Sequence, residues 1–116
     1  MILDSLTKLE VILAGAVTTN QLDVHVDYRD WVQNEPSRPA QFRVATNSAN
    51  DVTILAAPTG NTIREVLRVT VYNKDTVAAT ATIKTDDGTT ERIVVKQALN
   101  AAQSLLYEQT TSWKVL

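Results

Sequence analysis

Alternating apolar residues mark almost all of the second half of the chain. The pattern recurs in five segments separated by short polar stretches: Ile63–Asn73, Val77–Thr85, Glu91–Leu99, Ser104–Glu108 and Ser112–Leu116. A repeat of two residues is the period of a β-strand, in which successive side chains point to opposite faces of a sheet. Five such segments in succession, with no helical repeat between them, predict an all-β protein.

The polar stretches between these segments have the composition of turns. Asn73–Thr76 separates the first two segments, whose matched alternation predicts a hairpin. Asp86–Thr89 follows the second segment, and Gly88 within it supplies the positive φ that a tight reversal requires. We expect three residues of the third segment to continue the core face: Ile93, Val95 and Leu99.

In the first half of the chain, Gln21–Tyr28 is the clearest strand. Its apolar residues alternate with three polar ones, Asp23, His25 and Asp27, which therefore share the opposite face. Such a strand packs one side against the core and turns the other side to solvent or to a partner. Asp23, His25 and Asp27 are therefore candidate partner-contact residues.

The stretch that follows breaks the strand pattern. Asn34–Gln41 contains Pro36 and Pro39, and proline lacks the N–H that a central strand requires, so we expect a loop there. Phe42–Ala45 and Asp51–Ala57 are then predicted as two further short strands.

The amino-terminal residues admit two interpretations. The leucines of Met1–Leu13 recur at spacings of three and four, as in a helix. Leu9–Leu13 also contains β-branched residues, which favour a strand or an extended arm in the company of so many other strands. We expect residues 1–12 to form an extended arm or an edge strand, and such an arm is a candidate docking element.

Length limits how these strands can be arranged. A chain of 116 residues has room for one domain with one core, so residues 1–116 are expected to form a single domain. About eight strands suit two packed sheets or a closed barrel better than one open sheet. The sequential hairpins favour antiparallel order throughout.

Charge and cysteine content exclude several classes of protein. The formal net charge is −2 and the basic residues are not clustered, so we expect no binding to nucleic acid or to a membrane. The chain has no cysteine, which excludes disulfides and cysteine-ligated metals. Val11–Val17 is too short to span a bilayer, and no basic flank precedes it as in a signal peptide, so we expect a cytosolic product as made.

Few residues could carry a reaction. The chain has one histidine and no G-x-S-x-G sequence, which argues against nucleophilic catalysis. Asp23, His25 and Asp27 could bind a metal only with ligands from a neighbouring strand, because alternate strand positions lie about 7 Å apart. Asp86-Asp87-Gly88 resembles the start of a calcium loop but lacks the further ligands, so we interpret it as a turn. We expect no enzyme activity, no cofactor and no metal.

The aromatic residues could form a carbohydrate-stacking platform or serve as packing anchors. Tyr107 and Trp113 share the parity of core residues on their strands, which favours buried anchors. Trp31 precedes the proline-containing loop and is the better candidate for an interface anchor.

Three stretches of the chain have a distinctive order of strand and turn residues: Leu13–Leu22, Val52–Pro58, and Val69–Thr76 continued through Leu99 to Trp113–Leu116. They resemble a family of small virion proteins of tailed bacteriophages. The last strands of that family run N-x-D-T-x-x-x-x-V-x-I, a polar turn, L-V-K-x-x-L, P-G-x-x-L-x-Y and G-W-x-V-L. The chain has Ala101-Ala102 where relatives often carry Pro-Gly, and Ser112 where they often carry glycine before tryptophan. Both departures alter the turn chemistry.

The resemblance implies a jelly-roll-like antiparallel β-sandwich that serves as a capsid cement or decoration protein. Such a protein binds the outer surface of the phage head and reinforces contacts between capsomers. The implied partners are the major capsid protein and further copies of the chain, as a homodimer or homotrimer, and the implied location is the capsid surface of the virion. The alternative is a receptor- or glycan-binding module of a phage head or tail fibre, which would use exposed aromatics and the loop at Asn34–Gln41.

Overall fold

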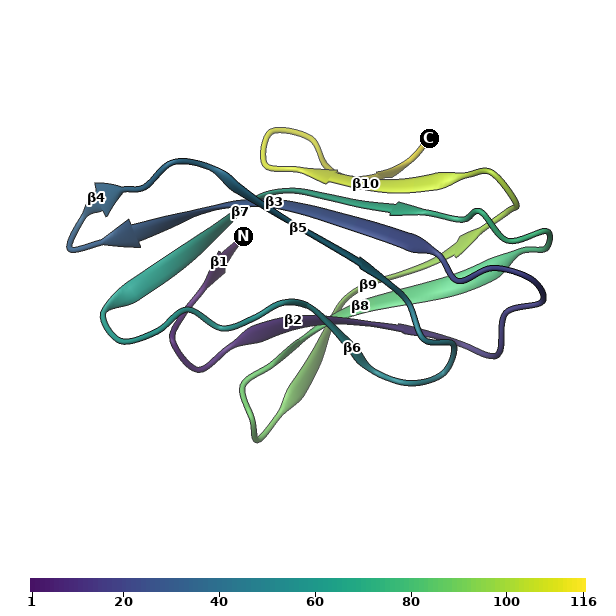
Figure 1. Ribbon diagram of the computed structural model, residues 1–116, viewed down its shortest axis with the longest axis horizontal. Helices are drawn as coiled ribbons and strands as arrows, with labels where there is room; N and C mark the ends of the chain where they lie inside the picture. The colour runs from purple at the N-terminus through teal and green to yellow at the C-terminus, as the bar shows by residue number, and fades with distance from the viewer.

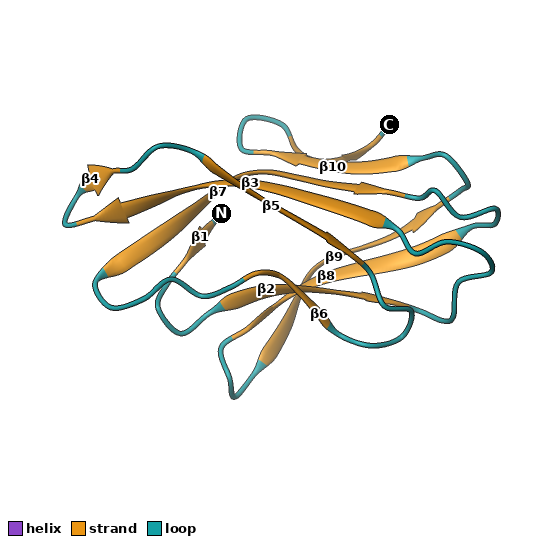
Figure 2. Ribbon diagram, in the orientation of Figure 1, coloured by secondary structure: helices purple, strands orange, loops and turns teal.

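The computed structural model describes all residues from Met1 to Leu116. It consists of eleven strands and the loops between them, and it has no helix (Figure 2). None of its elements is a helix that could span a lipid bilayer. The strands are β1 (Ile2–Leu3), β2 (Lys8–Leu13), β3 (Asp23–Val32), β4 (Glu35–Pro36), β5 (Ala40–Ala45), β6 (Val52–Leu55), β7 (Thr62–Tyr72), β8 (Ala79–Asp86), β9 (Glu91–Leu99), β10 (Ser104–Glu108) and β11 (Ser112–Val115). The excess over the predicted number comes mainly from β1 and β4, which have two residues each.

The strands form two antiparallel sheets, as predicted (Figure 1). Sheet A has seven strands: β11, β10, β7, β3 and β4 lie side by side in that order, while β1 also pairs with β7 and β5 with β3. Sheet B has four strands in the order β6, β2, β8, β9. Every strand pair is antiparallel, which confirms the all-β, antiparallel architecture.

The core lies between the two sheets and is built from the alternating residues of their facing sides. On β3 the buried residues are Val24 and Val26, and on β2 they include Leu9 and Val11. Seventeen buried side chains make one continuous cluster. The longer central strands contribute alternate residues to this cluster, such as Val24 and Val26 of β3 and Val69 and Val71 of β7, so the residues between them are turned to the outer faces of the molecule.

The amino-terminal residues are built into both sheets and are not an arm. β1 pairs with β7, and Leu3 is buried in the core. β2 is an internal strand that pairs with β6 on one side and β8 on the other. The ammonium group of Met1 donates a hydrogen bond to the hydroxyl oxygen of Tyr107 at 2.8 Å. Residues 1–12 therefore do not form the expected docking arm; the alternative of an edge strand holds for β1, which pairs with β7 alone, whereas β2 is internal.

β7 and β8 do not form the predicted hairpin. β7 lies in sheet A between β10 and β3, whereas β8 lies in sheet B between β2 and β9. Residues 73–78 carry the chain from one sheet to the other, and β8 begins at Ala79 rather than at Val77. The alternating pattern correctly predicted two strands but not their partners, because it carries no information on which strand lies alongside.

Asn73 fixes the start of this crossover. It is fully buried, and its Nδ2 donates to the backbone carbonyls of Val77 and Leu99, each at 3.0 Å. Its Oδ1 accepts a hydrogen bond from the N–H of Asp75 at 3.0 Å. A buried amide with these partners ties the end of β7 to the end of β9, so the polar residue contributes to the link between the sheets.

Asp75 fixes the other side of the crossover. Its carboxylate accepts hydrogen bonds from the backbone N–H groups of Thr18, Thr19 and Asn20 at 2.9, 2.8 and 3.1 Å. These bonds, led by the one from Thr18, lower the pKa of Asp75 to about 2. The crossover is thereby fastened to the loop between β2 and β3.

Ile93 does not face the core as predicted; its side chain is 68% exposed. The pairing of β8 with β9 changes register, because Ile83 pairs with Val95 while the next residue, Lys84, pairs with Ile93. Val94 is the extra residue of this β-bulge, so Val95 keeps the face of its partner Ile83 whereas Ile93 shares the outer face of its partner Lys84. Val95 and Leu99 keep the predicted orientation toward the core.

The carboxy-terminal aromatics pack together as predicted for anchors. Tyr107 is buried, and Trp113 is partly buried against the core cluster. Their ring centroids lie 5.0 Å apart with an interplanar angle of 41°, which is a favourable tilted arrangement. Burial raises the pKa of the Tyr107 hydroxyl.

Two residues at the turns that flank β10 and β11 adopt left-handed backbone conformations. Ala102 has φ of +66° and Ser112 has φ of +61°. Glycine accommodates this region without a steric penalty, whereas residues with a Cβ atom do not.

Candidate functional site

All four candidate contact residues lie on the outer face of one strand. β3 runs without interruption from Asp23 to Val32, so its odd-numbered positions share the face opposite the core. His25 is exposed, and the others are half-buried. We call this surface the β3 face and define it by five residues: Asp23, His25, Asp27, Arg29 and Trp31. The prediction that Asp23, His25 and Asp27 share one side is confirmed, and the structure adds Trp31 to the same side.

Neighbouring strands widen the β3 face and balance its charge. Arg43 on β5 and Thr70 on β7 flank His25, and Arg68 on β7 lies beside Asp27. Asp23 makes an ion pair with Lys74 at 3.0 Å, and Arg68 makes one with Glu108 at 3.1 Å. These pairs are exposed, so water competes with them and they contribute little to stability.

Tyr72 and Trp31 mark the two ends of the β3 face. Tyr72 pairs with Asp23 at one end and is 39% exposed. At the other end Trp31 pairs with Ile63, which is 43% exposed. The intervening residues are polar, so an aromatic side chain stands at each end of a charged strip.

Trp31 is held in a fixed orientation. Its Nε1 donates a hydrogen bond to Oε1 of Glu65 at 3.0 Å, and Gln109 donates one to Oε2 of Glu65 at 2.8 Å. These two hydrogen bonds, that of Gln109 first, lower the pKa of Glu65. An indole anchored in this way presents its ring to a partner without first losing rotational freedom.

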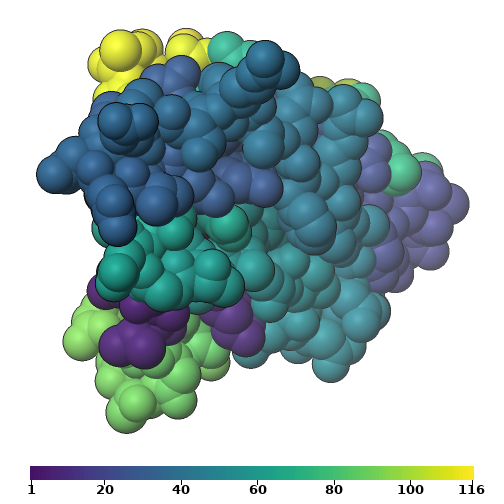
Figure 3. Space-filling view, turned by 60° about the vertical axis from the view of Figure 1, so that its left-hand side comes forward, coloured from purple at the N-terminus to yellow at the C-terminus, as the bar shows by residue number.

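The loop after Trp31 is shorter than predicted. β3 ends at Val32, and Gln33 and Asn34 form a tight turn with φ of +51° and +65°. β4 then pairs back onto the end of β3, with Pro36 beside Trp31 at the edge of the sheet, where proline is tolerated. Figure 3 shows this end of the molecule, with residues of the 30–40 range in blue above the start of β7 in teal.

A shallow depression of about 670 Å³ adjoins the β3 face. It lies where β7 forms a β-bulge opposite Asp27, so that Leu67 has no partner on β3. Its lining is mostly polar and comes from β3, the β4–β5 segment, β7 and the end of β10: Asp27, Pro39, Ala40, Gln41, Leu67, Arg68, Glu108, Gln109 and Thr110. The β3 face is therefore open and broad, with a hollow along one side.

Asp86 and Asp87 close the β8–β9 turn, as predicted. Asp87 Oδ1 accepts hydrogen bonds from the N–H groups of Thr89 and Thr90 at 2.9 and 2.7 Å, and the bond from Thr90 is the largest cause of the lowered pKa of Asp87. Gly88 has φ of +89°. Asp86 Oδ1 likewise accepts a hydrogen bond from the N–H of Gly88 at 2.8 Å, so both carboxylates bind backbone N–H groups of the turn.

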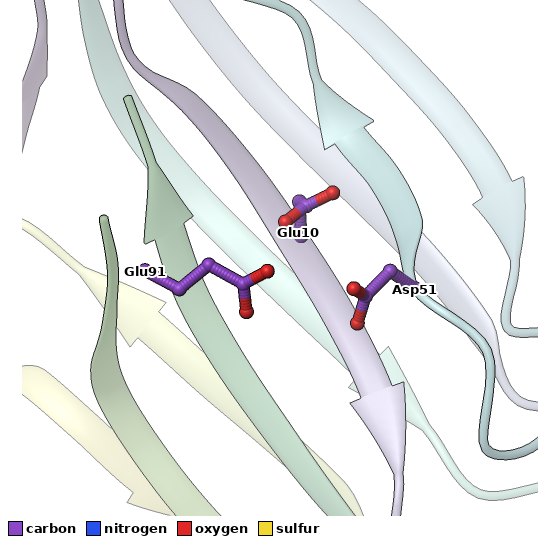
Figure 4. A group of neighbouring side chains, drawn as sticks. All are labelled: Glu10, Asp51 and Glu91. Carbon is purple, nitrogen blue, oxygen red and sulfur yellow. The ribbon is translucent and has the colours of Figure 1, made fainter. Parts of the chain in front are cut away.

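Asp23, His25 and Asp27 do not form a metal-binding cluster. The one set of three metal-ligating side chains whose ligand atoms lie within 4.8 Å of one another is on the outer face of sheet B. It consists of Glu10 on β2, Asp51 just before β6 and Glu91 at the start of β9 (Figure 4). No local pattern predicts this cluster, because its members are spread along the chain from position 10 to position 91.

Lys84 lies among these three carboxylates. Its ammonium group contacts Asp51 at 2.8 Å and also forms an ion pair with Glu91. The hydrogen bond with Asp51, followed by that with Glu91, raises the pKa of Lys84. Glu10 Oε2 lies 3.2 Å from the ammonium of Lys8, whereas Glu10 Oε1 is buried and has no hydrogen-bond partner. We call these residues the sheet B cluster: Glu10, Asp51, Lys84 and Glu91.

Comparisons with known proteins give no relative for this chain: no family model, no curated protein and no solved structure matches it.

Proposed function

We propose that the protein is a capsid cement or decoration protein of a tailed bacteriophage. It binds the outer surface of the head through the β3 face and reinforces contacts between capsomers. The observation that carries the binding mode is the alignment of Asp23, His25, Asp27 and Trp31 on one outward side of β3. The identity of the partner, the major capsid protein, comes from the resemblance.

The composition of the β3 face supports a protein partner. Interface residues that contribute most to affinity are enriched in tryptophan, tyrosine and arginine. This face and its flanking strands contain Trp31, Tyr72 and three arginines, Arg29, Arg43 and Arg68. The ten residues of β3 extend over about 33 Å, a length suited to a protein–protein interface.

The backbone at Ala102 and Ser112 supports the resemblance. Relatives often carry glycine at these two positions, and in this chain both residues adopt the left-handed conformation that glycine favours. A turn geometry retained despite a less suitable residue is what we expect when a chain shares the family's backbone.

In this function the protein acts by mechanical reinforcement of the capsid shell. A protein that binds across neighbouring capsomers adds its binding free energy to the work of separating them, and so opposes the outward pressure of packaged DNA. Many copies on one head make modest individual affinities sufficient. β9 is an edge strand of sheet B on which Ile93 is 68% exposed, and we propose that contacts between copies, as a dimer or trimer, use such an edge.

The test uses heads of the encoding phage assembled without this protein. We expect them to lose DNA at a lower temperature than complete heads, and to recover their heat resistance when the purified protein is added. Heat resistance that is the same with and without the protein, together with no binding to the heads, would contradict the proposal.

The depression beside Asp27 favours one alternative, a glycan-binding module of a head or tail fibre. Its polar lining of carboxylate, amide, guanidinium and hydroxyl groups offers hydrogen bonds to sugar hydroxyls. Labelling of the protein on purified phage distinguishes the two functions. Label over the whole head surface supports a cement protein, whereas label at fibre tips, with loss of host adsorption when the protein is removed, supports the alternative.

A further inference from the structure

We propose that the sheet B cluster is a site for a calcium-like divalent cation, which enters in exchange for the ammonium group of Lys84. This site lies on the opposite side of the molecule from the β3 face, and its function does not depend on capsid binding.

The ligand set suits a hard cation. All three acidic ligands, Glu10, Asp51 and Glu91, offer carboxylate oxygens, and neither histidine nor cysteine is present in the cluster. Calcium binds six to eight oxygens at about 2.3–2.6 Å, so two of its ligands lie at most about 5 Å apart. The ligand atoms of the cluster lie within 4.8 Å of one another, inside that limit. Three carboxylates can supply up to about six oxygens, since each binds through one or both of its oxygen atoms.

Glu10 provides a second observation that points to a ligand. Its side chain is 5% exposed, and Oε1 has no hydrogen-bond partner. A buried carboxylate oxygen without a partner is costly, because it has lost water and gained nothing in return. Figure 4 shows the Glu10 carboxylate between those of Glu91 and Asp51. A cation held by Glu91 and Asp51 would therefore also lie beside Glu10.

Lys84 now supplies the positive charge in the cluster. Three carboxylates against one ammonium leave a net charge of −2, and Lys8, which contacts Glu10, offsets part of it. A divalent cation carries more charge than the ammonium it replaces and can be bound by three carboxylates at once. Lys84 has a flexible stem and can turn outward to solvent, so the exchange requires no movement of the backbone.

The position of the site gives the expected consequence. Asp51 leads into β6 and Glu91 begins β9, the two edge strands of sheet B, while Glu10 belongs to the internal strand β2. A bound cation would therefore connect both edges of the sheet through its centre. Because the cation binds the folded chain, thermal stability should increase with its concentration.

The first experiment measures calcium binding to the complete protein by isothermal titration calorimetry and by thermal unfolding. We expect a dissociation constant of about 0.1–1 mM and a rise in Tm of about 5 °C at ten times that concentration, reversed by a chelator. Magnesium should bind more weakly, because it demands a smaller, strictly octahedral site. Absence of calcium binding to the wild-type protein at about 10 mM would overturn the proposal.

Variants test the ligand assignment and the role of Lys84. Asp51→Asn and Glu91→Gln change exposed side chains and should fold normally while weakening calcium binding at least tenfold; Glu10→Gln should do the same. Lys84→Met removes the competing ammonium and should tighten binding about tenfold. Asp23→Asn, on the β3 face, is the matched control and should bind like the wild type. Equal binding by all of these variants would overturn the assignment.

Discussion

The two outer faces of the sandwich differ in how their charged side chains are arranged. On the β3 face of sheet A, charged groups are spread along a strand, paired at the surface and framed by aromatic side chains at both ends. On sheet B, three carboxylates and Lys84 are gathered in one cluster, in which Glu10 and Lys84 are buried. The first arrangement offers a long contact surface, and the second offers a single small site.

This difference indicates two kinds of ligand. Dispersed polar groups around fixed aromatics suit a macromolecule, which gains affinity from many contacts over a large area. A concentrated set of oxygens with one unpaired member suits an ion, which gains its affinity from a few short bonds. Changes on one face should therefore leave the function of the other intact, provided that the sheets remain joined.

The largest effect should come from Asn73→Ala, which breaks the link between the sheets. It leaves the buried carbonyls of Val77 and Leu99 without a donor, and we expect a loss of about 3 kcal/mol in the free energy of unfolding. Urea unfolding followed by circular dichroism measures it. Asn61→Ala, in an exposed turn, is the control. If both substitutions cost the same, the two faces do not depend on this link.

Trp31→Ala tests the β3 face. We expect capsid binding to weaken by about 2 kcal/mol, or roughly 30-fold, because an anchored aromatic is removed from the end of the contact surface. Stability should change by about 1 kcal/mol or less, since the ring is half exposed. Phe42→Ala is the matched control: Phe42 is 44% exposed but pairs with Val26, whose side chain faces the core. Co-sedimentation with capsids gives both affinities.

Lys84→Met tests the sheet B cluster without added calcium. Removing the ammonium leaves three carboxylates to repel one another, and we expect stability to fall by about 1 kcal/mol. Chemical unfolding in the presence of a chelator measures the change. Capsid binding should be the same as in the wild type, and a parallel loss of binding would show that the two faces are coupled.

The smallest effect should come from Ala102→Gly and Ser112→Gly. Each substitution removes the steric strain of a Cβ atom at a left-handed backbone position. The greater freedom of glycine in the unfolded chain offsets part of this effect, so we expect the free energy of unfolding to rise by about 0.5 kcal/mol. Thermal unfolding measures it. These variants alter stability without touching either face. A change in capsid binding would therefore implicate the turns themselves in docking.

The β3 face could be predicted because it depends on one strand. A period of two residues assigns Asp23, His25 and Asp27 to one side, wherever that strand lies in the sheet. Trp31 joins them only because β3 continues to Val32, past the predicted end at Tyr28. Arg29 and Asp30 do not continue the apolar alternation, so the strand pattern ends before them. Pairing with β7 extends the strand through these two residues.

The sequence-based predictions that were wrong concern features that depend on pairing between distant segments. The crossover that places β7 and β8 in different sheets is fastened by hydrogen bonds of Asn73 and Asp75 to distant segments, which local alternation does not reveal. Ile93 lies outside the core because of a β-bulge at Val94. The sheet B cluster likewise arises only when β2, β6, β8 and β9 are aligned, so no local pattern could have predicted it.

The claim that the β3 face binds the capsid is tested most directly by one comparison. Heads assembled without the protein are titrated with wild-type protein, Trp31→Ala and Lys84→Met, and bound protein is measured after sedimentation. We predict roughly 30-fold weaker binding for Trp31→Ala and wild-type binding for Lys84→Met. Wild-type binding by Trp31→Ala, with binding lost in Lys84→Met, would contradict the account and assign capsid contact to sheet B.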